Sequence, residues 1–434
     1  MTSLTTAARL AALMDHLGLA RAHVATQVAS DVAGFAAQHP ERIGALVLCA
    51  PTRLDPAPFE KLAARLLLIS GDKGLTAQTA EAAQARLSQA RNHVLQNYAA
   101  AAWSDVIADR GGEVAARMIA FLTDAPAIPN AAPAPRSGVH AGLTYRVEGA
   151  GPPLILLPFF LAPSQWDPAL AELARHFTVI RLGGAHIGGV AALEDRARAP
   201  SYRAMFRTLV DLMAPEPTSR ILDVGCGSGA LDRQLAERLP GARIDAVDVN
   251  PFLQREAAAL AAGFGDRIRF APGGATALPF PDQTFDAVFS VTVLEECDAE
   301  KAIAEFLRVT RPGGRIAVVV RAIDLPQWWN LKLPPAIKAK ADVPPQSVDP
   351  SGVADASLYA RLARAGLVDL VGFPTLVTID DPDGPIWRYR EDHVLAQLTP
   401  AETETWHAAR AAALRDGTLL HASALHCAVG RKPG

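Results

Sequence analysis

The most restrictive feature of the sequence is an apolar segment that runs directly into three alternate glycines. RILDVG at 220–225 has the length and composition of a buried strand. It leads through Gly225, Gly227 and Gly229 into ALDRQLAERL, whose apolar residues recur at helical spacing. Glycine allows the backbone to turn sharply and to approach a ligand without a Cβ clash. The segment therefore predicts a strand, a ligand-binding turn and a helix of an α/β sheet.

The glycine pattern alone is compatible with two ligands. Gly225, Gly227 and Ala230 fit the G-x-G-x-x-G/A fingerprint of a dinucleotide-binding turn. Asp223, with the three glycines, equally fits the D-x-G-x-G-x-G turn that holds S-adenosylmethionine. In both cases the start of the helix offers N–H groups and a positive dipole end to an anionic group. The turn therefore leaves hydride transfer and methyl transfer open.

The segments downstream of the turn distinguish the two ligands. Asp248, near the end of the strand ARIDAVDVN, can accept ribose hydroxyls in either case. GGATALPF (273–280), FDAVFS (285–290) and RVTRPGGRIAVVV (308–320) then follow in order. They resemble the adenine turn, the fourth strand and the fifth strand of class I S-adenosylmethionine-dependent methyltransferases. The resemblance is strongest to the small-molecule branch that includes the ubiquinone- and menaquinone-biosynthesis enzymes.

This resemblance implies a Rossmann-like, seven-stranded sheet at 201–434, S-adenosylmethionine as the cofactor and a set of cofactor-binding residues. They are Asp223, Gly225, Cys226, Gly227 and Gly229 for the methionine part, Asp248 and Val249 for the ribose, Ala275 and Thr276 beside the adenine, and Ser290 at the end of the fourth strand. The family usually carries an Asp where this chain has Gly274. A buried adenine amino group without that partner would cost about 1–3 kcal/mol.

Candidate groups for the chemical step follow the fourth strand. Methyl transfer from a sulfonium is an in-line displacement that depends on positioning, and a general base helps when the acceptor is a hydroxyl or a protonated amine. Glu295 and Glu296 either face the methyl group or lie on a solvated turn, with Asp298 capping the next helix. His426, on the expected last strand, is a candidate base or a hydrogen-bonded structural histidine. Further candidates are His393 and His421.

Two aromatic segments, LPQWWNLKLPP at 325–335 and the insertion at 380–420, lie where this fold recognises acceptors. Their side chains form either the wall of a pocket for a planar or lipophilic molecule or an ordinary core. The residues concerned are Trp328, Trp329, Trp387 and Tyr389. Arg388 and Arg390 can bind an anionic acceptor. The N-P-P-Y and Pro-Cys signatures of DNA-methylating enzymes are absent, so we expect a small-molecule acceptor.

The N-terminal region resembles an α/β-hydrolase whose two halves are exchanged. Residues 1–122 look like the later part of that fold, and 137–195 like its opening strands, with GLTYRVEG and PLILLPFF as hairpin-like strands. A Pro/Ala-rich stretch at 123–136 predicts an exposed linker. A weaker boundary is expected near 195–201. The two pieces would then form one circularly permuted, parallel-sheet domain before the methyltransferase domain.

The residues needed for hydrolase chemistry are largely missing from this region. The nucleophile of that fold sits in G-x-S-x-G, but no glycines flank Ser30 in ATQVASDVAG. Pro158, Phe159 and Phe160 stand at the oxyanion-hole position, and proline has no N–H to donate. No histidine follows HVLQNY, so only Asp72 remains at a triad-like place. We therefore expect a non-catalytic domain.

Composition narrows the remaining classes of function. A net charge of -3 without a block of like charges argues against nucleic-acid binding. The four scattered cysteines predict neither a zinc site nor disulfides. The N-terminal stretch does not read as a signal peptide, and the apolar run at 154–163 is too short to span a membrane, so we expect a cytoplasmic protein. The alternatives are an NAD(P)-dependent oxidoreductase, a hydrolase with an accessory S-adenosylmethionine-binding domain, and a non-catalytic S-adenosylmethionine-binding regulator.

Overall fold

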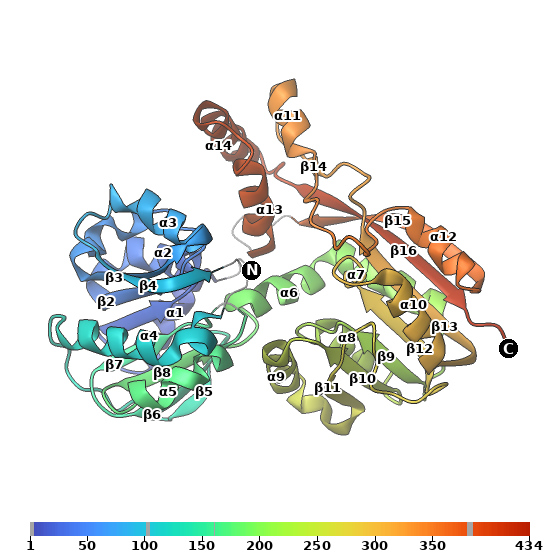
Figure 1. Ribbon diagram of the computed structural model, residues 1–434, viewed down its shortest axis with the longest axis horizontal. Helices are drawn as coiled ribbons and strands as arrows, with labels where there is room; N and C mark the ends of the chain where they lie inside the picture. The colour runs from blue at the N-terminus through green and yellow to red at the C-terminus, as the bar shows by residue number, and fades with distance from the viewer. Residues whose placement is uncertain (1–3, 101–104, 160, 380–384) are drawn as a thin grey trace. The chain divides into compact units, whose positions relative to one another are not determined.

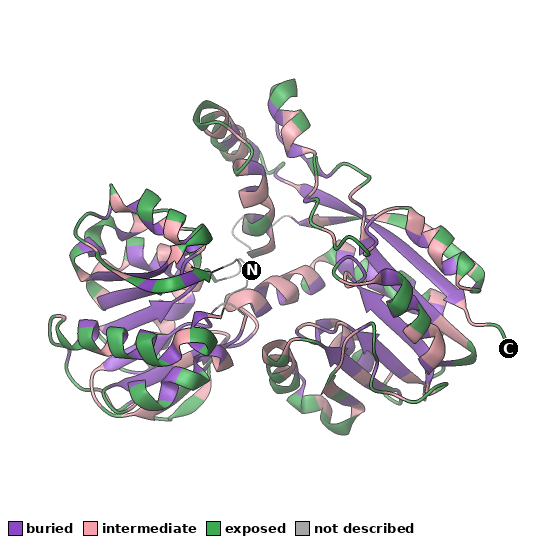
Figure 2. Ribbon diagram, in the orientation of Figure 1, coloured by how far each residue is buried: buried purple, intermediate pink, exposed green. Residues whose placement is uncertain are grey.

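The structure is a computed structural model that describes residues 4–100, 105–159, 161–379 and 385–434. The chain divides into two compact units, Met1–Ala191 (unit 1) and Ala192–Gly434 (unit 2). Each unit is built on its own sheet of strands with helices on both faces (Figure 1). Figure 2 shows that most strands are buried along much of their length, whereas the helices expose one side.

The sheet of unit 1 joins both N-terminal segments of the sequence. In spatial order its strands are β4 (Arg91–Ala100), β3 (Leu66–Lys73), β2 (Ile43–Cys49), β1 (Ala22–Thr26), β7 (Pro153–Leu156), β8 (Thr178–Gly183), β6 (Leu143–Gly149) and β5 (Ser137–His140). β1 pairs in parallel with both β2 and β7, so the pieces on either side of 123–136 form one sheet. The expected hairpin is wrong: β6 pairs with β5 and β8, and β7 pairs with β1 and β8.

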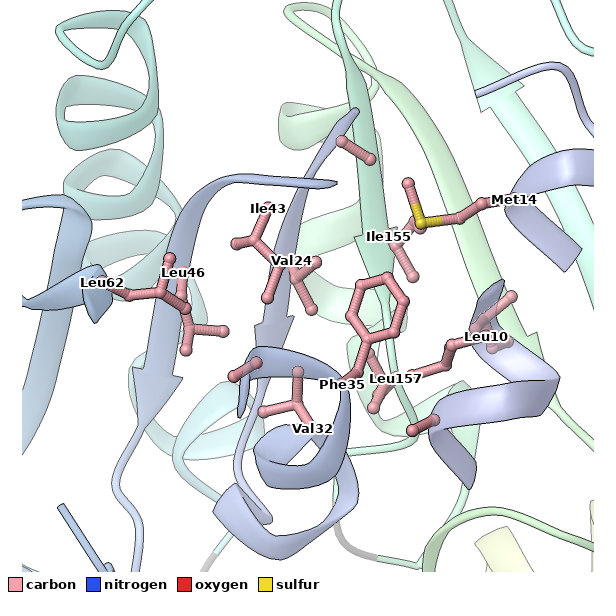
Figure 3. Packing of buried hydrophobic residues seen from close by; sticks show 14 of the residues in the cluster. Leu10, Met14, Val24, Val32, Phe35, Ile43, Leu46, Leu62, Ile155 and Leu157 are labelled. Atoms are coloured by element: carbon pink, nitrogen blue, oxygen red, sulfur yellow. The ribbon is translucent and has the colours of Figure 1, made fainter. Parts of the chain in front are cut away.

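Helices cover both faces of this sheet because β1 and β2 are apolar and buried on each side. One face packs against α1 (Thr6–His16), α2 (Ala29–Gln38), η2 (Ala57–Arg65) and α3 (Gly74–Gln84). The other face packs against α4 (Val106–Thr123) and α5 (Asp167–Leu173). Figure 3 shows Leu10 and Met14 of α1 and Phe35 of α2 beside Val24 and Ile155 of the sheet. The short helices η1 (Pro40–Arg42) and η3 (Pro163–Trp166) complete the unit.

The stretch between α4 and β5 has no helix or strand, as expected from its composition. It is nevertheless not simply exposed. Ile128 is buried, and Ala131 donates its N–H to the carbonyl of Gly151 at 3.2 Å. The hydroxyl of Thr178 in turn donates to the carbonyl of Ala131 at 2.8 Å. The predicted exposed linker is therefore fastened to unit 1 by both apolar and polar contacts.

The sheet of unit 2 has eight strands rather than the expected seven. Its order is β11 (Ile268–Pro272), β10 (Arg243–Asp248), β9 (Arg220–Val224), β12 (Phe285–Val291), β13 (Thr310–Arg321) and β16 (His421–Arg431), with β15 (Val368–Ile379) and β14 (Trp328–Trp329) also paired to β16. The first five strands are parallel, and β16 is antiparallel to β13. The additional strand is β14, which is two residues long and therefore lacks a sequence signal.

The helices of unit 2 also lie on both faces of its sheet. α7 (Pro200–Met213) and α8 (Ala230–Arg238) share one core, while α10 (Ala299–Val309) and α12 (Ser357–Arg364) share the other. α9 (Pro251–Leu260) and η4 (Ala262–Arg267) join β10 to β11. A separate core unites α11 (Pro335–Ala341), α13 (Pro385–Leu395) and α14 (Pro400–Arg415). Only Ala199 separates α6 (Gly188–Arg198) from α7, so the boundary expected at 195–201 lies mostly in helices.

Among the described residues, no helix combines the length and the apolar character needed to cross a bilayer. Within the same residues, no group of three or more His, Cys, Asp or Glu side chains is arranged to hold a metal ion.

Candidate functional site

The turn between β9 and α8 requires glycine at several positions. Gly225, Gly227 and Gly229 have φ of 84°, 55° and 70°, the left-handed region that side chains rarely adopt. A Cβ atom added at Gly225 would overlap Val293 Cγ2, and one at Gly229 would lie 2.8 Å from Phe270 Cζ. The strand, turn and helix are thus formed as the sequence predicted, and no larger residue fits Gly225 or Gly229 without rearrangement.

Asp248 at the end of β10 holds this turn in place. One carboxylate oxygen accepts the N–H of Gly227 at 2.9 Å, and the other accepts the N–H of Asn250 at 2.8 Å. Gly225 and Cys226 both donate to the carbonyl of Val247. A carboxylate has about four lone-pair sites, so Asp248 retains acceptor capacity for ligand hydroxyls. The N–H groups of Gly225, Cys226 and Gly227 donate within the protein. The N–H groups at the start of α8 are therefore the ones that would bind an anionic group.

Beneath the turn, Asp223 and Asp232 bring two carboxyl groups together. Asp223 is the penultimate residue of β9 and is 2% exposed, and Asp232 lies in the first turn of α8 and is fully buried. Burial and the Asp232 carboxyl raise the pKa of Asp223 well above its usual value. Burial raises the pKa of Asp232 to about 7. Asp232 could not be identified from the sequence, because an acid in the first turn of a helix is ordinary.

The thiol of Cys226 is not a nucleophile in this setting. It is buried, and its pKa lies well above the usual value because of burial and the nearby carboxyl groups. A thiol with such a pKa stays protonated near neutral pH, and the thiolate is the reactive form. Cys226 therefore contributes a small buried side chain to the turn.

A second residue that the sequence did not reveal is Glu194 on α6. Its carboxylate accepts the hydroxyl of Ser228 at 2.6 Å and the guanidinium of Arg233 at 2.6 and 2.7 Å. Arg233 also donates to the carbonyl of Ser228 at 2.8 Å. The next contact is apolar: a Cβ atom at Gly227 would lie 3.0 Å from Leu193 Cδ1. α6 is therefore fixed directly against the glycine turn.

The residues expected around the ribose and adenine lie at the carboxyl ends of β10 and β11. Gly273 donates its N–H to the carbonyl of Asp248 at 3.1 Å, which brings the two strand ends together. Val249 is 76% exposed, Ala275 is buried and Thr276 is exposed. A Cβ atom at Gly274 would meet only Val249, at an ordinary 3.4 Å.

Ser290 is placed differently from this group. Its side chain is fully buried, and its hydroxyl donates to the carbonyl of Val224 at 2.8 Å. This bond joins the end of β12 to the end of β9. Ser290 therefore supports the floor of the site, and its hydroxyl is committed to the backbone rather than presented to a ligand.

The acidic candidates after β12 have contrasting surroundings. Glu295 is fully buried and accepts the N–H of Arg321 at 2.7 Å; burial raises its pKa. Glu296 is 70% exposed, and its carboxylate lies 3.7 Å from the Arg321 guanidinium. Asp298 accepts the N–H of Lys301 and caps α10, as expected. A raised pKa is the direction that a carboxylate needs to act as a general base near neutral pH, so Glu295 remains a candidate for that role.

His426 takes part in a closed network on β16. Its Nε2 lies 2.8 Å from Asp324 Oδ1, and its Nδ1 lies 3.0 Å from the Tyr359 hydroxyl. The side chain is buried, and both ring nitrogens are occupied. This geometry favours the structural alternative for His426.

The other two histidines lie outside the glycine turn. His421, at the start of β16, is fully buried with Nε2 3.2 Å from Gln327 Oε1, and burial lowers its pKa to about 3. A histidine with such a pKa is neutral near pH 7. His393 lies on α13.

The tryptophans after β13 form a core rather than an open pocket. Trp329, Trp387 and Trp406 are buried, and the ring of Trp329 meets the other two edge to face at 5.2 and 5.1 Å. Trp387 and Trp406 donate their indole N–H groups to Glu391. Burial decides between the two alternatives that the sequence left open for Trp329 and Trp387.

The other two aromatic candidates of these segments are far more exposed than the buried tryptophans. Trp328 is 46% exposed, and Tyr389 is 52% exposed. Burial lowers the pKa of Arg390 to about 10. The side chain of Arg388 lies outside the described residues.

In unit 1, the residue at the strand–helix junction is Gln27, which the sequence analysis did not single out. Gln27 is buried and donates to the carbonyl of Ala50 at 3.4 Å. Ser30 is exposed in the first turn of α2, so it does not stand at the nucleophile position. Asp72 accepts the N–H groups of Asn97 and Tyr98, both at 2.9 Å, and these bonds lower its pKa. Phe160 lies outside the described residues.

Comparison with known proteins assigns a family to part of unit 2. Residues 221–314 match the family model described as a methyltransferase domain. A demethylmenaquinone methyltransferase from Thermus thermophilus is 41% identical over 26% of this chain and 52% of its own length. A probable tocopherol O-methyltransferase from Oryza sativa is 32% identical over 36% and 42%, respectively. The ubiquinone/menaquinone biosynthesis C-methyltransferase UbiE from Paracoccus denitrificans is 34% identical over 29% and 52%.

The chain thus spans about half the length of the curated relatives that it matches. The matched residues include the glycine turn, Asp248 and β12. Unit 2 therefore contains a class I methyltransferase domain whose cofactor is S-adenosylmethionine.

Proposed function

We propose that this protein transfers a methyl group from S-adenosylmethionine to a small-molecule acceptor. The observation that carries the proposal is the bond between Asp248 and the N–H of Gly227, at the mouth of a turn where φ excludes most side chains. This arrangement places a carboxylate with spare acceptor capacity beside an open glycine backbone. It suits a ligand with a ribose and a compact charged tail.

The proposed cofactor residues lie in or near the glycine turn and at the ends of the strands beside it. We assign the ribose to Asp248 and the methionine part to the turn. The proposed residues of the methionine part are Asp223, Gly225, Cys226, Gly227 and Gly229, Val249 is proposed beside the ribose, and those near the adenine are Gly274, Ala275 and Thr276. When bound, the cofactor supplies a methyl group already activated by a positive sulfur. The protein then has to orient the acceptor and exclude water, which can provide much of the rate.

The nature of the acceptor is argued from the matched relatives. By their names, they act on demethylmenaquinone, tocopherol and precursors of ubiquinone and menaquinone. We propose an acceptor of the same size class. Glu295 is the proposed general base, since it is buried close to the end of β12 and its pKa is raised. The exposed Glu296 and the bonded His426 are weaker candidates.

For unit 1 we propose a circularly permuted α/β-hydrolase fold without hydrolase activity. If β5 is counted as the first strand and β4 as the last, the sheet order reads 1-2-4-3-5-6-7-8, the order of that fold. The proposed domain joins 1–122 and 137–195 through the stretch at 123–136, and the methyltransferase domain occupies 201–434. The buried Gln27 at the junction and the engaged Asp72 support the absence of hydrolysis.

Calorimetric titration of the full chain tests the proposed function. We expect S-adenosylhomocysteine to bind with micromolar affinity and Asp248→Ala to weaken it at least about 10-fold through lost hydrogen bonds. Asp245→Ala is the matched control, because Asp245 lies on the same strand but pairs with Arg220. NADH binding without S-adenosylhomocysteine binding would overturn the proposal in favour of an oxidoreductase.

A further inference from the structure

Asp232 is the least satisfied polar group near the glycine turn. Its carboxyl group is fully buried, and neither oxygen meets a hydrogen-bond donor in the described part of the chain. Its interacting neighbour is the carboxyl of Asp223 on β9, itself 2% exposed. Two carboxylates have no hydrogen between them, so their contact becomes a hydrogen bond only when one is protonated. A buried polar group without a partner calls for an explanation.

The cation that acts on Asp232 among the described residues is Arg233, and it is shared with other groups. On α8, Arg233 is already bound to Glu194 of α6 and to the carbonyl of Ser228. The other ionisable groups that act on the pair are the carboxylate of Asp248 on β10, the thiol of Cys226 in the turn and the phenol of Tyr202 on α7. Burial raises the pKa of both Cys226 and Tyr202, so these two stay neutral. Two adjacent buried carboxyls in such surroundings cannot both ionise without a counter-charge.

We propose that Asp223 and Asp232 share one proton in the free protein, and that the methionine ammonium group of the cofactor displaces this proton on binding. The inference rests on the proposed function, because it assumes that the methionine part lies at the glycine turn. The exchange conserves charge: the pair carries one negative charge with the proton, and the ionised pair plus the ammonium group carry the same net charge. The released proton passes to solvent, and no covalent bond changes. Asp232 is thus a positioning residue that acts on the ligand through Asp223.

The exchange makes cofactor affinity depend on pH in a defined direction. Below the pKa of the pair, the proton competes with the ammonium group, so binding is weaker. Burial raises the pKa of both carboxyl groups, so the affinity for S-adenosylhomocysteine should increase severalfold from pH 6 to pH 7.5. The same coupling predicts that ligand binding at pH 7 releases a proton to the buffer.

Two ligands and two variants test the proton exchange by calorimetry. S-adenosylhomocysteine carries the ammonium group, whereas 5′-methylthioadenosine lacks the whole amino-acid part. We expect the pH dependence and the proton release, measured in buffers of different ionisation enthalpy, only with S-adenosylhomocysteine.

In Asp232→Asn the amide can donate to an ionised Asp223, so affinity should change less than twofold across the same pH range. Asp211→Asn, at an exposed ion pair with Arg238, should behave as wild type.

The outcomes separate this inference from the proposed function. S-adenosylhomocysteine binding that is equally tight at pH 6 and pH 7.5, without proton release, overturns the shared proton and leaves the proposed function intact. Equal pH dependence with 5′-methylthioadenosine overturns the link to the ammonium group. No S-adenosylhomocysteine binding at any pH rejects the proposed function itself. The wild-type measurements decide the matter even if Asp232→Asn does not fold.

Discussion

Units 1 and 2 share an architecture but differ at the same structural point. In each sheet, two central strands send their following helices to opposite faces: β1 and β7 in unit 1, and β9 and β12 in unit 2. Ligands of open α/β sheets bind at the carboxyl ends of strands at such a point. Unit 2 has a left-handed glycine turn there, with a carboxylate beside it. Unit 1 has a buried Gln27 followed by Val28 in extended backbone.

The difference shows that the sheet supplies a place for a ligand and that the junction residues decide whether it is used. Both sheets are buried on both faces by ordinary apolar contacts, which would be compatible with either outcome. In unit 2 the junction gains an open backbone, acceptor groups and α6 fixed by Glu194. In unit 1 the junction instead holds the buried side chain of Gln27. Substitutions at each junction can therefore break or sharpen the contrast.

The largest effect is expected at Gly225. Gly225→Ala places a Cβ atom against Val293 Cγ2 in a backbone with φ of 84°. A strained conformation of this kind costs about 1–3 kcal/mol, and the overlap adds to it, so S-adenosylhomocysteine binding should fall roughly 100-fold. Gly263→Ala is the matched control, because a Cβ atom there meets nothing within 4 Å. Unchanged affinity in Gly225→Ala would show that the turn does not need to approach the ligand closely.

A smaller effect is expected at Glu194, which joins α6 to the turn. Glu194→Gln leaves the Arg233 guanidinium, only 15% exposed, without its counter-charge. Loss of one partner of a buried ion pair costs about 3–5 kcal/mol, so thermal unfolding should occur at a lower temperature. S-adenosylhomocysteine affinity should fall about 10-fold, as expected for one weakened hydrogen bond at Ser228.

The double variant Glu194→Leu/Arg233→Leu separates the effect of the lost ion pair on stability from the effect of the lost hydrogen bond on ligand affinity. It removes both charges, so it should unfold at a higher temperature than Glu194→Gln. Its affinity should remain low, because leucine at position 194 leaves the Ser228 hydroxyl without this acceptor. A double variant that is less stable than Glu194→Gln would contradict the assignment of a buried ion pair.

The parts of the site that the sequence predicted are those set by local backbone. Gly225 and Asp248 could be identified because a positive φ and a strand-end carboxylate depend on residues close in the chain. Glu194 and Asp232 could not, because each matters through burial beside residues from other elements. The same limit applied to Trp387, whose role in a core depended on contacts with Trp329 and α14. Many strands were predictable from their apolar segments, but their pairing was not: β6 and β7 do not form the expected hairpin, and the two-residue β14 had no signal.

At Gly274 we expect a substitution to increase ligand affinity rather than lower it. The Cβ atom of Gly274→Asp would lie 3.4 Å from Val249 Cγ1, an ordinary contact, and φ at Gly274 is not left-handed. The new carboxylate would provide the acceptor that related enzymes offer to the adenine amino group. S-adenosylhomocysteine affinity should therefore increase about fivefold, at the lower end of the value of a hydrogen bond. Gly274→Ala distinguishes the acceptor from added bulk. If neither variant tightens binding, adenine does not lie at this turn.

The smallest effect is expected in unit 1, where hydrolysis should not respond to substitution. Ser30→Ala removes an exposed hydroxyl, and Asp72→Asn alters a carboxylate already bonded to two backbone N–H groups. Release of p-nitrophenol from its acetate should be the same for both variants and for wild type. A rate in wild type that Ser30→Ala abolishes would assign catalysis to unit 1.

Gln27→Ser extends the test by placing a hydroxyl at the junction itself. It should still give no hydrolysis, because Val28 keeps an extended backbone and no flanking glycine creates the strained turn that exposes a nucleophile. The contrast between the units would then reside in the backbone of the junction, and one side chain would not reverse it.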